Sequence, residues 1–483
     1  MYKKRGKIGI MYNELLKALE AQNISKNQFC KDVNISKAYI NKVFGGSTPM
    51  SERLFTSILA LPYLSDKVKE EITKVRFESK HGENYELVMY FNEAAKEFDK
   101  RSMPNDIIET ELPGEGLILT DKNEIVRLAY SLAKHSIKSG AVLCSNHTYA
   151  QKDIDDALYT AFYERDEEQL DTNFIHIMEK PYVFNKKYIN CIWSALRYGT
   201  IGIIPLVTDE VIASFLLPHV MVCDKFVLMW NEECDKAHFV CDHALGSAVR
   251  DGFNSLKERS VPFSVVCVDE AEIMTKEAPD PFSITAESPV VIDCVPGCFA
   301  NEPNPEIWMQ VVRTDLPDKK AKLLIDSYLN HHHFHLKNIK KHYIVSDSLL
   351  SFARTGQCAS LSHRYINDFS VQLRKITLDT WKDSFKKEKN FIIDSTKIFF
   401  PPFVQMDYCR SSARIHMNSV YRKFHIYNVT LTINHSDNIG SRKFFDALLD
   451  YQTNPDAIMT GTQIDYTIES LKLLCDNGYV QYR

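Results

Sequence analysis

The stretch that decides the fold of the N-terminal region is Ile24-Ser-Lys-Asn-Gln-Phe-Cys-Lys-Asp-Val-Asn-Ile-Ser-Lys-Ala-Tyr-Ile-Asn-Lys-Val-Phe-Gly-Gly46. Ser25 and Gln28 have the spacing of a capping box, which marks the start of a helix. Phe29 and Val33 are four residues apart, so they lie on one face of that helix. The stretch predicts two short helices joined by a tight turn.

The turn and the second helix follow from the remaining residues of the stretch. Asn34 falls at the turn, where a left-handed backbone favours Gly or Asn. Ser36 can cap the second helix, and Gly45 with Gly46 can stop it. The apolar positions of the second helix form one stripe: Ile40, Val43 and Phe44.

Further helices are predicted on both sides of this pair. Leu15, Leu16 and Leu19 indicate an amphipathic helix before it. After it, Ser51 can cap a helix that Pro62 ends, and a last helix is expected over 66–78. The apolar residues of the helix after Ser51 are Leu54, Ile58 and Leu59. Four or five short helices predict an all-α domain over residues 1–82.

Residues 8–78 resemble the lambda-repressor-like (Cro/repressor, XRE-type) helix-turn-helix DNA-binding domain, and the match runs without a gap from Ser25 to Gly46. The family usually has Ala where this chain has Cys30, and often Gly where it has Asn34. Both replacements fit sterically, because Cys is small and Asn tolerates a left-handed backbone. The resemblance implies a domain that binds double-stranded DNA.

The resemblance also implies a set of contact residues. These are Lys26 and Asn27 in the first helix, Lys37, Ala38, Tyr39, Asn41 and Lys42 in the second, and Ser47 and Thr48 after it. Lys37 could donate to guanine, Asn41 could pair with adenine, and Ala38 or Tyr39 could touch a thymine methyl group. The two hydroxyl residues could hold phosphates. Alternatively, all of these are solvated residues of a small domain that contacts proteins.

The distribution of charge favours DNA as the partner of the N-terminal domain. Residues 1–82 contain 15 Lys and Arg against 8 Asp and Glu, a net charge of +7. The whole chain has a net charge of −5, so the remainder carries −12. A basic module on an acidic body suits phosphate binding. The arm from Lys3 to Lys7 could follow the DNA backbone or be a solvated terminus.

Length and composition predict a multidomain protein of the cytoplasm. The 483 residues allow two to four domains, and 45% hydrophobic with 25% charged residues is ordinary for a globular protein. No apolar run approaches the ~20 residues that cross a bilayer, and no signal peptide is expected. The 12 cysteines are scattered singly, which indicates reduced, mostly buried thiols.

After a linker expected at 80–84, the pattern mixes strands and helices and predicts a large α/β or α+β body. The main helices are predicted at 122–139, 186–198, 243–259, 442–451 and 467–477, and the main strands at 173–178, 201–207, 226–230, 263–268, 289–295, 343–345, 391–393 and 426–433. A Pro-rich passage places a boundary near 318, which gives regions 83–318 and 319–483. The two halves look loosely alike, without a firm repeat.

Three clusters could bind a ligand, and each has a plainer interpretation. His331–His335 could bind a metal or an anion, but neighbouring side chains point in different directions. Cys234, His238, Cys241 and His243 match no established zinc spacing, and 294–298 fits an ordinary Pro-Gly turn. No phosphate loop, dinucleotide fingerprint or protease signature is present. We therefore predict no metal, no cofactor and no enzymatic activity.

These observations favour a sequence-specific transcriptional regulator. Its N-terminal domain would bind an operator as a homodimer, since one module makes few base contacts. The body would dimerise, sense a small-molecule or peptide effector, or do both. The alternatives are an enzyme or defence-type effector with an appended DNA-binding module, and a protein-interaction scaffold. The operator, the effector and the direction of regulation are not predicted.

Overall fold

The fold is described from a computed structural model. The residues that it describes are 15–45, 47–48, 50–100, 107–147, 151–165, 174–181, 183–208, 217–263, 265–267, 289–296, 305–317, 319, 322, 326, 339–358, 366–384, 389–418 and 428–476. Among these residues, no helix combines the length and the apolar composition needed to cross a membrane.

The N-terminal part, residues 15–81, is all helical and is called the head below. Its helices are 15–21, α2 (Lys26–Asp32), α3 (Lys37–Phe44), α4 (Glu52–Leu59) and α5 (Asp66–His81). The predicted caps are confirmed, because the hydroxyls of Ser25, Ser36 and Ser51 each accept a hydrogen bond from the backbone amide three residues later. Asn34 has a φ of 52°, as a left-handed turn requires, whereas Gly45 ends α3 with an ordinary φ of −79°.

One small apolar core holds the head together. Phe29, Ile40, Phe44 and Phe55 are almost fully buried in it. The other contributors include Leu15, Leu19, Cys30, Val33, Val43, Leu54, Ile58, Leu59 and Ile72. The helical stretch 15–21 and α5 both supply members, so α5 belongs to the head along one of its faces.

The linker expected at 80–84 is wrong. Helix α5 continues through His81, and α6 (Glu83–Lys100) begins directly after Gly82. Gly82 has a φ of 58°, a conformation that residues with a side chain rarely adopt, so this glycine breaks one long helical run into two. The polar residues that suggested a linker lie at the end of α5 and the start of α6.

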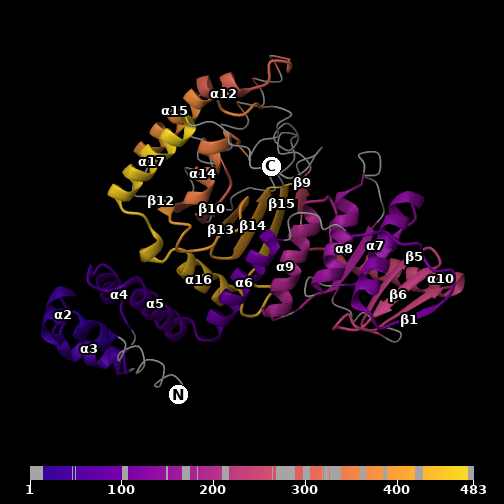
Figure 1. Ribbon diagram of the computed structural model, residues 1–483, viewed down its shortest axis with the longest axis horizontal. Helices are drawn as coiled ribbons and strands as arrows, with labels where there is room; N and C mark the ends of the chain where they lie inside the picture. The colour runs from indigo at the N-terminus through magenta and orange to yellow at the C-terminus, as the bar shows by residue number, and fades with distance from the viewer. Residues whose placement is uncertain are drawn as a thin grey trace.

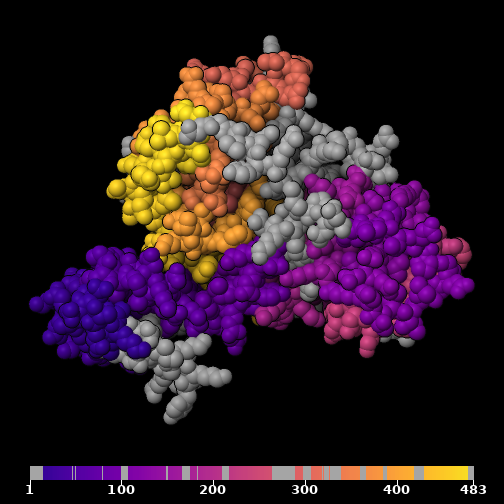
Figure 2. All heavy atoms as spheres, viewed as in Figure 1, coloured from indigo at the N-terminus to yellow at the C-terminus, as the bar shows by residue number. Residues whose placement is uncertain are grey.

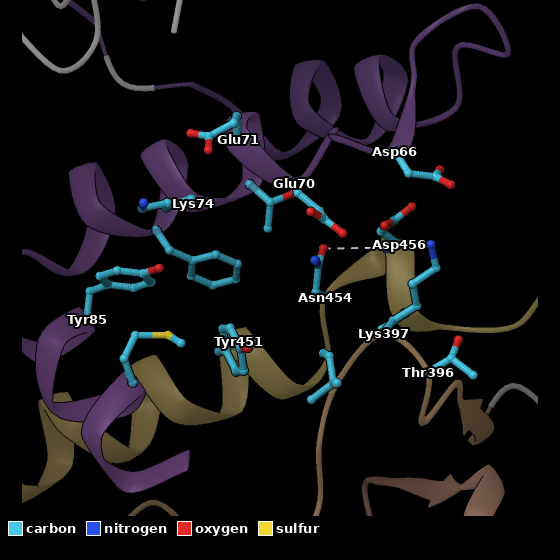
Figure 3. A pocket seen from close by; sticks show the side chains of 15 residues that line it. Asp66, Glu70, Glu71, Lys74, Tyr85, Thr396, Lys397, Tyr451, Asn454 and Asp456 are labelled. Carbon is cyan, nitrogen blue, oxygen red and sulfur yellow. Dashed lines mark hydrogen bonds between the residues drawn. The ribbon is translucent and has the colours of Figure 1, made fainter. Parts of the chain in front are cut away.

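The head rests on the body through α5. Lys80 and His81 both contact the carboxylate of Asp450, each at 2.8 Å, and Phe77 packs edge-on against Tyr451 with 5.7 Å between ring centroids. A groove lies beside these contacts, between α5 and the body (Figure 3). The head occupies one end of the long axis of the molecule (Figures 1 and 2), so it offers a separate surface to a partner.

The first half of the body, residues 107–263, is built on a mixed sheet of eight strands in the order β1-β7-β6-β5-β2-β3-β4-β8. The strands are β1 (Leu117–Leu119), β2 (Leu143–Ser145), β3 (Phe174–Glu179), β4 (Leu206–Thr208), β5 (His219–Cys223), β6 (Phe226–Trp230), β7 (Ala237–Cys241) and β8 (Val261–Pro262). Strands β2, β3 and β4 are parallel to each other, and the other pairs are antiparallel. The helices are α7 (Lys122–Ser139), α8 (Lys152–Tyr163), α9 (Lys186–Gly199) and α10 (His243–Arg259).

The second half, residues 265–476, has a sheet of seven described strands in the order β12-β11-β10-β13-β14-β15-β9. The strands are β9 (Val265–Cys267), β10 (Val290–Asp293), β11 (Lys341–Val345), β12 (Asn390–Ile393), β13 (Val404–Tyr408), β14 (Ser412–Asn418) and β15 (Asn428–Asn434). Its helices are α12 (Pro305–Val311), α14 (Ser346–Thr355), α15 (Val371–Ser384), α16 (Ser441–Gln452), the short 3-10 helix η3 (Pro455–Ala457) and α17 (Gly461–Asp476).

The two sheets have the same topology. Adding eight to each strand number converts β1-β7-β6-β5-β2-β3-β4 into β9-β15-β14-β13-β10-β11-β12, and the parallel and antiparallel pairs also correspond. Strand β8, which pairs with the edge strand β4, has its counterpart in a bridge between Ile393 and Ile458. The body is therefore a structural duplication, which the loose likeness of the sequence halves did not establish.

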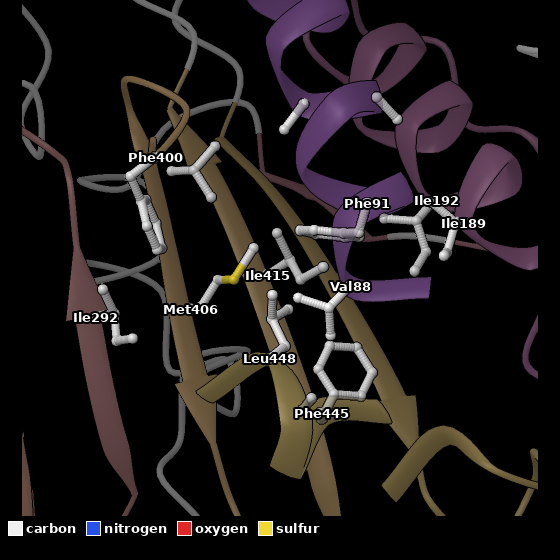
Figure 4. Packing of buried hydrophobic residues seen from close by; sticks show 14 of the residues in the cluster. Val88, Phe91, Ile189, Ile192, Ile292, Phe400, Met406, Ile415, Phe445 and Leu448 are labelled. Carbon is white, nitrogen blue, oxygen red and sulfur yellow. The ribbon is translucent and has the colours of Figure 1, made fainter. Parts of the chain in front are cut away.

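Helix α9 joins the two halves. Every residue from Tyr188 to Gly199 is buried. Together with α6, it packs on the apolar face of β13, β14 and β15 (Figure 4), and Trp193 lies 5.0 Å from Phe91 between ring centroids. A Cβ atom on Gly199 would lie 2.6 Å from Cγ2 of Val429, so the absence of a side chain lets helix and sheet approach closely.

The predicted mixed α/β or α+β body is confirmed. Its two sheets, however, do not meet at the boundary expected near residue 318. The chain passes from the first sheet to the second between residues 263 and 265, so the boundary expected near 318 falls inside the second half. The Pro-rich passage lies in the sequence between β10 and α12, which both belong to the second half. Several helices begin and end within a residue or two of prediction, whereas the strand predicted at 201–207 is confined to β4.

Candidate nucleic-acid interface

Helix α3 has one buried and one exposed face. Ile40, Val43 and Phe44 are buried in the core of the head, as the stripe predicted. Among the residues implied as DNA contacts, Asn27, Lys37, Ala38, Asn41, Lys42 and Ser47 are exposed, and Lys26, Tyr39 and Thr48 are half-buried. The helical period thus separates packing residues from surface residues within eight positions.

Two hydrogen bonds connect α2 and α3 across this surface. Lys26 Nζ donates to Asn41 Oδ1 at 2.6 Å, and Lys37 Nζ donates to Asn27 Oδ1 at 3.1 Å. The structure therefore brings four of the implied contact residues together, from positions up to 15 apart in the sequence. It also orients the Asn41 amide, because its oxygen accepts from a lysine of the neighbouring helix.

Other implied contact residues have structural roles that the sequence did not suggest. The hydroxyl of Ser47 donates to the carbonyl of Lys42 at 2.9 Å, and the backbone amides of Ser47 and Thr48 also bond to that carbonyl. These bonds close the C-terminal end of α3. Tyr39 packs against the core of the head, which leaves Ala38 as the more exposed of the two residues considered for an apolar base contact.

The acidic group closest in sequence to this surface is held at the end of α2. Asp32 accepts from Gln28 Nε2 at 2.7 Å and from the hydroxyl of Tyr63 at 2.8 Å. Burial and the hydrogen bond to Asp32 raise the pKa of Tyr63 above its usual value, so the phenol stays protonated and keeps donating. The carboxylate is thereby fixed by two donors at the C-terminal end of α2.

A second polar cluster lies deep in the first half and was missed in the sequence. His147 is fully buried; its Nδ1 lies 2.9 Å from Ser145 Oγ, and its Nε2 lies 2.8 Å from the hydroxyl of Tyr198. Asp155 is 3.5 Å from the same Nε2 and also forms an ion pair with Arg197. These groups come from β2, the loop after it, α8 and α9, so only the folded chain unites them.

The folded environment favours the charged form of one basic group in this cluster and the neutral form of two others. Burial favours the neutral form of Arg197, but Asp155 and Asp156 outweigh burial and raise its pKa. Burial lowers the pKa of His147, and it lowers the pKa of His176, stacked 4.3 Å from His147, to about 3. The cluster therefore holds a charged guanidinium between carboxylates, beside two neutral imidazoles.

A third polar group lies in the second sheet. Asp407 and His416 are only 3% and 6% exposed, and His416 Nε2 lies 3.0 Å from Asp407 Oδ2. The other imidazole nitrogen lies 3.0 Å from the hydroxyl of Thr430, and Gln405 donates to Asp407 at 2.8 Å. In the sequence, β13, β14 and β15 alternate polar and apolar residues, and strand periodicity alone does not distinguish a buried polar position from a solvated one.

The clusters singled out in the sequence as ligand sites gain no support. His331–His335 lies outside the described residues, as does Cys298. Cys234 is buried whereas His243 is exposed at the start of α10. In the described part of the chain, no group of three or more His, Cys, Asp or Glu residues is arranged to hold a metal ion.

Comparisons with known proteins identify no family. No protein-family model matches the sequence, and no curated protein matches it. Among solved structures, the crystal structure of phosphatidylserine synthase from Haemophilus influenzae Rd KW20 matches with 9% sequence identity, over 80% of this chain and 96% of that chain. The TM-score is 0.24, which is too low to indicate a shared fold or a shared activity.

Proposed function

We propose that this protein is a sequence-specific DNA-binding transcriptional regulator, whose head is a helix-turn-helix domain of the lambda-repressor-like kind. The observation that carries the proposal is the exposed face of α3, with Lys37, Asn41 and Lys42 on its surface and the start of α2 hydrogen-bonded to it. A helix so exposed at a domain surface can enter a major groove, while α2 crosses the backbone.

Charge and position support this function. The head is basic and the rest of the chain is acidic, so phosphates attract the head and repel the body. The head lies at one end of the molecule (Figure 2), where a duplex can approach α3 without meeting the two sheets. The hydrogen bonds from Lys26 and Lys37 would exchange for bonds to phosphates or bases on binding.

A homodimer on a two-fold operator is part of the proposal. A single head presents few residues for base contacts, and two heads on symmetric half-sites would give the affinity that a regulator needs. The duplicated body, which leaves Lys37, Asn41 and Lys42 of α3 exposed, would supply the dimer contact and the site for an effector.

Selection of bound duplexes from a random pool tests the proposal. We expect a recovered motif with two-fold symmetry and an affinity that falls steeply with salt. The double variant K37A/N41A should bind the selected duplex at least about tenfold more weakly, since a good base contact is worth ~1–3 kcal/mol. The matched control K236A/N254A alters an exposed lysine and an exposed asparagine of the body and should bind normally.

Two results would overturn the proposal. One is a pool without any enriched motif. The other is an equal loss of affinity in K37A/N41A and in K236A/N254A, which would show that the face of α3 is not the binding surface. If K37A/N41A retains DNA binding but loses a protein partner, the head is an interaction module instead.

A further inference from the structure

The groove beside the joint of head and body has the size of a small-molecule site. It encloses about 440 Å³, within the ~300–1,000 Å³ of typical ligand pockets. Helices α5 and α6 form one wall, and α16, η3 and residues 396–398 form the other (Figure 3). Both parts of the molecule therefore line the same space.

The interior of the groove is aromatic and apolar. Phe77 and Tyr451 pack edge-on against each other, and Tyr85, Met89 and Ile398 extend the same lining. Burial, followed by the negative charge of Glu78, raises the pKa of Tyr85 to about 12, so the ring stays neutral and its hydroxyl remains a donor. Ring faces next to negative charge attract cations.

The rim of the groove is acidic. Asp66, Glu70, Glu71 and Asp456 line it, against Lys74 and Lys397. In the part of the chain that the structure describes, none of the four carboxylates has an ion-pair partner. Figure 3 shows Glu70 of α5 and Asp456 of η3 directed toward the same part of the groove from its two walls.

A buried amide at the end of the groove has hydrogen-bonding capacity to spare. Asn454 is 8% exposed, and its Oδ1 accepts a long bond of 3.4 Å from the amide of Asp456. Its Nδ2 has no acceptor among the described residues, and its side chain points toward Glu70 (Figure 3). The Nδ2 atom is accessible from the groove, where a polar atom of a ligand can accept a hydrogen bond from it.

We propose that this groove binds an organic cation, an amine or quaternary ammonium group attached to an apolar body. The cationic group lies between Glu70 and Asp456, the apolar body lies on Phe77 and Tyr451, and Asn454 bonds a polar atom of the ligand. The described groove residues do not form a metal site, and a bare metal ion would leave the aromatic lining unused.

The ligand has a consequence for the head. The face of α5 that carries Val68, Ile72 and Val75 packs in the core of the head, so α5 moves with it. A molecule that contacts both α5 and η3 stabilises the docked position of the head on the body. If the protein is the proposed DNA-binding regulator, this ligand is its effector, and the inference then rests on the proposed function. Binding of the cation in the groove does not depend on DNA binding.

Calorimetry on the full chain without DNA tests the site. The probes are benzyltrimethylammonium, the neutral benzyl alcohol and the anionic benzenesulfonate. We expect saturable one-site binding of the cation only, reduced at least tenfold in E70Q/D456N. The control D251N/E258Q removes two exposed carboxylates of α10 and should bind like the parent chain. Thermal melting checks that both variants fold.

Hydrogen exchange measured on the same samples locates the probe. Amides of α5 should exchange more slowly when benzyltrimethylammonium is added to the parent chain. In E70Q/D456N the same addition should leave their exchange rates unchanged. Equal binding of all three probes, full binding by E70Q/D456N, or slowed exchange only outside α5, α16 and η3 would each overturn the proposal. Because DNA is absent, these outcomes are independent of whether the head binds an operator.

Discussion

The two halves of the body share a framework but differ in what they bury. The backbone hydrogen bond from Asn146 N to Val220 O corresponds to the one from Cys294 N to Val404 O. This correspondence aligns the strands of the first sheet with those of the second. The faces under α10 and α16 then match, since each carries an apolar cluster. Val222 and Met229 of the first half occupy the places of Met406 and Met417 in the second.

The opposite faces have diverged. In the first half, Cys223, Leu228 and Phe239 pack in a core with α7 and α8. The corresponding residues of the second half are Asp407, His416 and Thr430, which form a buried hydrogen-bonded group. The topology therefore constrains the backbone and one apolar face, while the other face can become polar without changing strand order.

The first half has its own buried polar network, but in another place. Arg197 on α9 lies 2.6 Å from Asp156 and also pairs with Asp155, at the end of β2 and β3 that faces α8. The Arg197 network and the Asp407 group lie at non-equivalent positions, and the second half also buries Asp293 and His342, whose side chains lie 3.8 Å apart. Buried networks fix geometry when all members are satisfied and are costly when one is removed.

The largest expected effect is that of removing the cation of the first-half network. Arg197→Met leaves Asp155 and Asp156 buried without their partner, which should cost about 3–5 kcal/mol of the free energy of unfolding. Denaturant unfolding followed by tryptophan fluorescence measures the cost, and hydrogen exchange should show the loss in β2 and β3 first. The control K382M breaks the ion pair between Lys382 and Glu469 in the second half. Because Glu469 is 55% exposed, this change should lower the free energy of unfolding by less than about 1 kcal/mol. Equal costs would mean that the Arg197 network is not a stabilising feature of the first half.

The joint between the halves gives the next effect. Gly199→Val places methyl groups against Val429, and overpacking of this kind typically costs about 1–3 kcal/mol. The second change V429A should restore part of the loss in the double variant, because it makes room at the same contact. Thermal melting of the three variants gives the comparison. If V429A does not relieve G199V, then α9 and β15 are not in the close contact that joins the halves.

Much of the head could be predicted from the sequence, because its signals are local. Ser25, Ser36 and Ser51 cap helices whose apolar stripes recur at the helical period, and Asn34 occupies a turn that needs a left-handed residue. The residues predicted as DNA contacts came from the family resemblance, and most of them are exposed. The bonds that link Lys26 to Asn41 and Lys37 to Asn27 could not be predicted, since they depend on the packing angle of two helices.

The duplication and the groove could not be predicted. Corresponding strands such as β6 and β14 agree on one face, as at Met229 and Met417, but differ on the other, as at Leu228 and His416, so no firm repeat was visible. Strand order is set by pairings between distant segments. The groove unites α5 with η3, which are almost 400 positions apart. Single helices and strands were foreseeable, whereas each site made by more than one element depended on tertiary structure.

Exchanging residues between the halves sharpens the comparison of their polar faces. D407C and H416L place the first-half residues Cys223 and Leu228 at the corresponding positions of the second sheet. Each single change leaves a buried partner without its hydrogen bond and should cost about 1–3 kcal/mol. The double variant should cost about 1 kcal/mol less than the sum, measured by denaturant unfolding as a double-mutant cycle. Strictly additive costs would show that Asp407 and His416 do not act as a pair.

The last prediction concerns the pH dependence of the free energy of unfolding. His176 occupies the position that corresponds to Ile344, and burial lowers its pKa to about 3 against an ordinary value near 6.5. Between these values the unfolded chain binds a proton that the folded chain does not. The contribution of His176 to stability is therefore complete above pH 6.5 and is lost as the pH falls, by at most about 1.4 kcal/mol per pH unit. H176I removes the titrating group from both states, so its unfolding free energy should fall less steeply between pH 6.5 and 4, whatever its value at pH 7. Parallel curves for the parent chain and H176I would mean that folding does not lower the pKa of His176, so that this position of the first half accepts a proton as readily as the unfolded chain does where the second half holds an isoleucine.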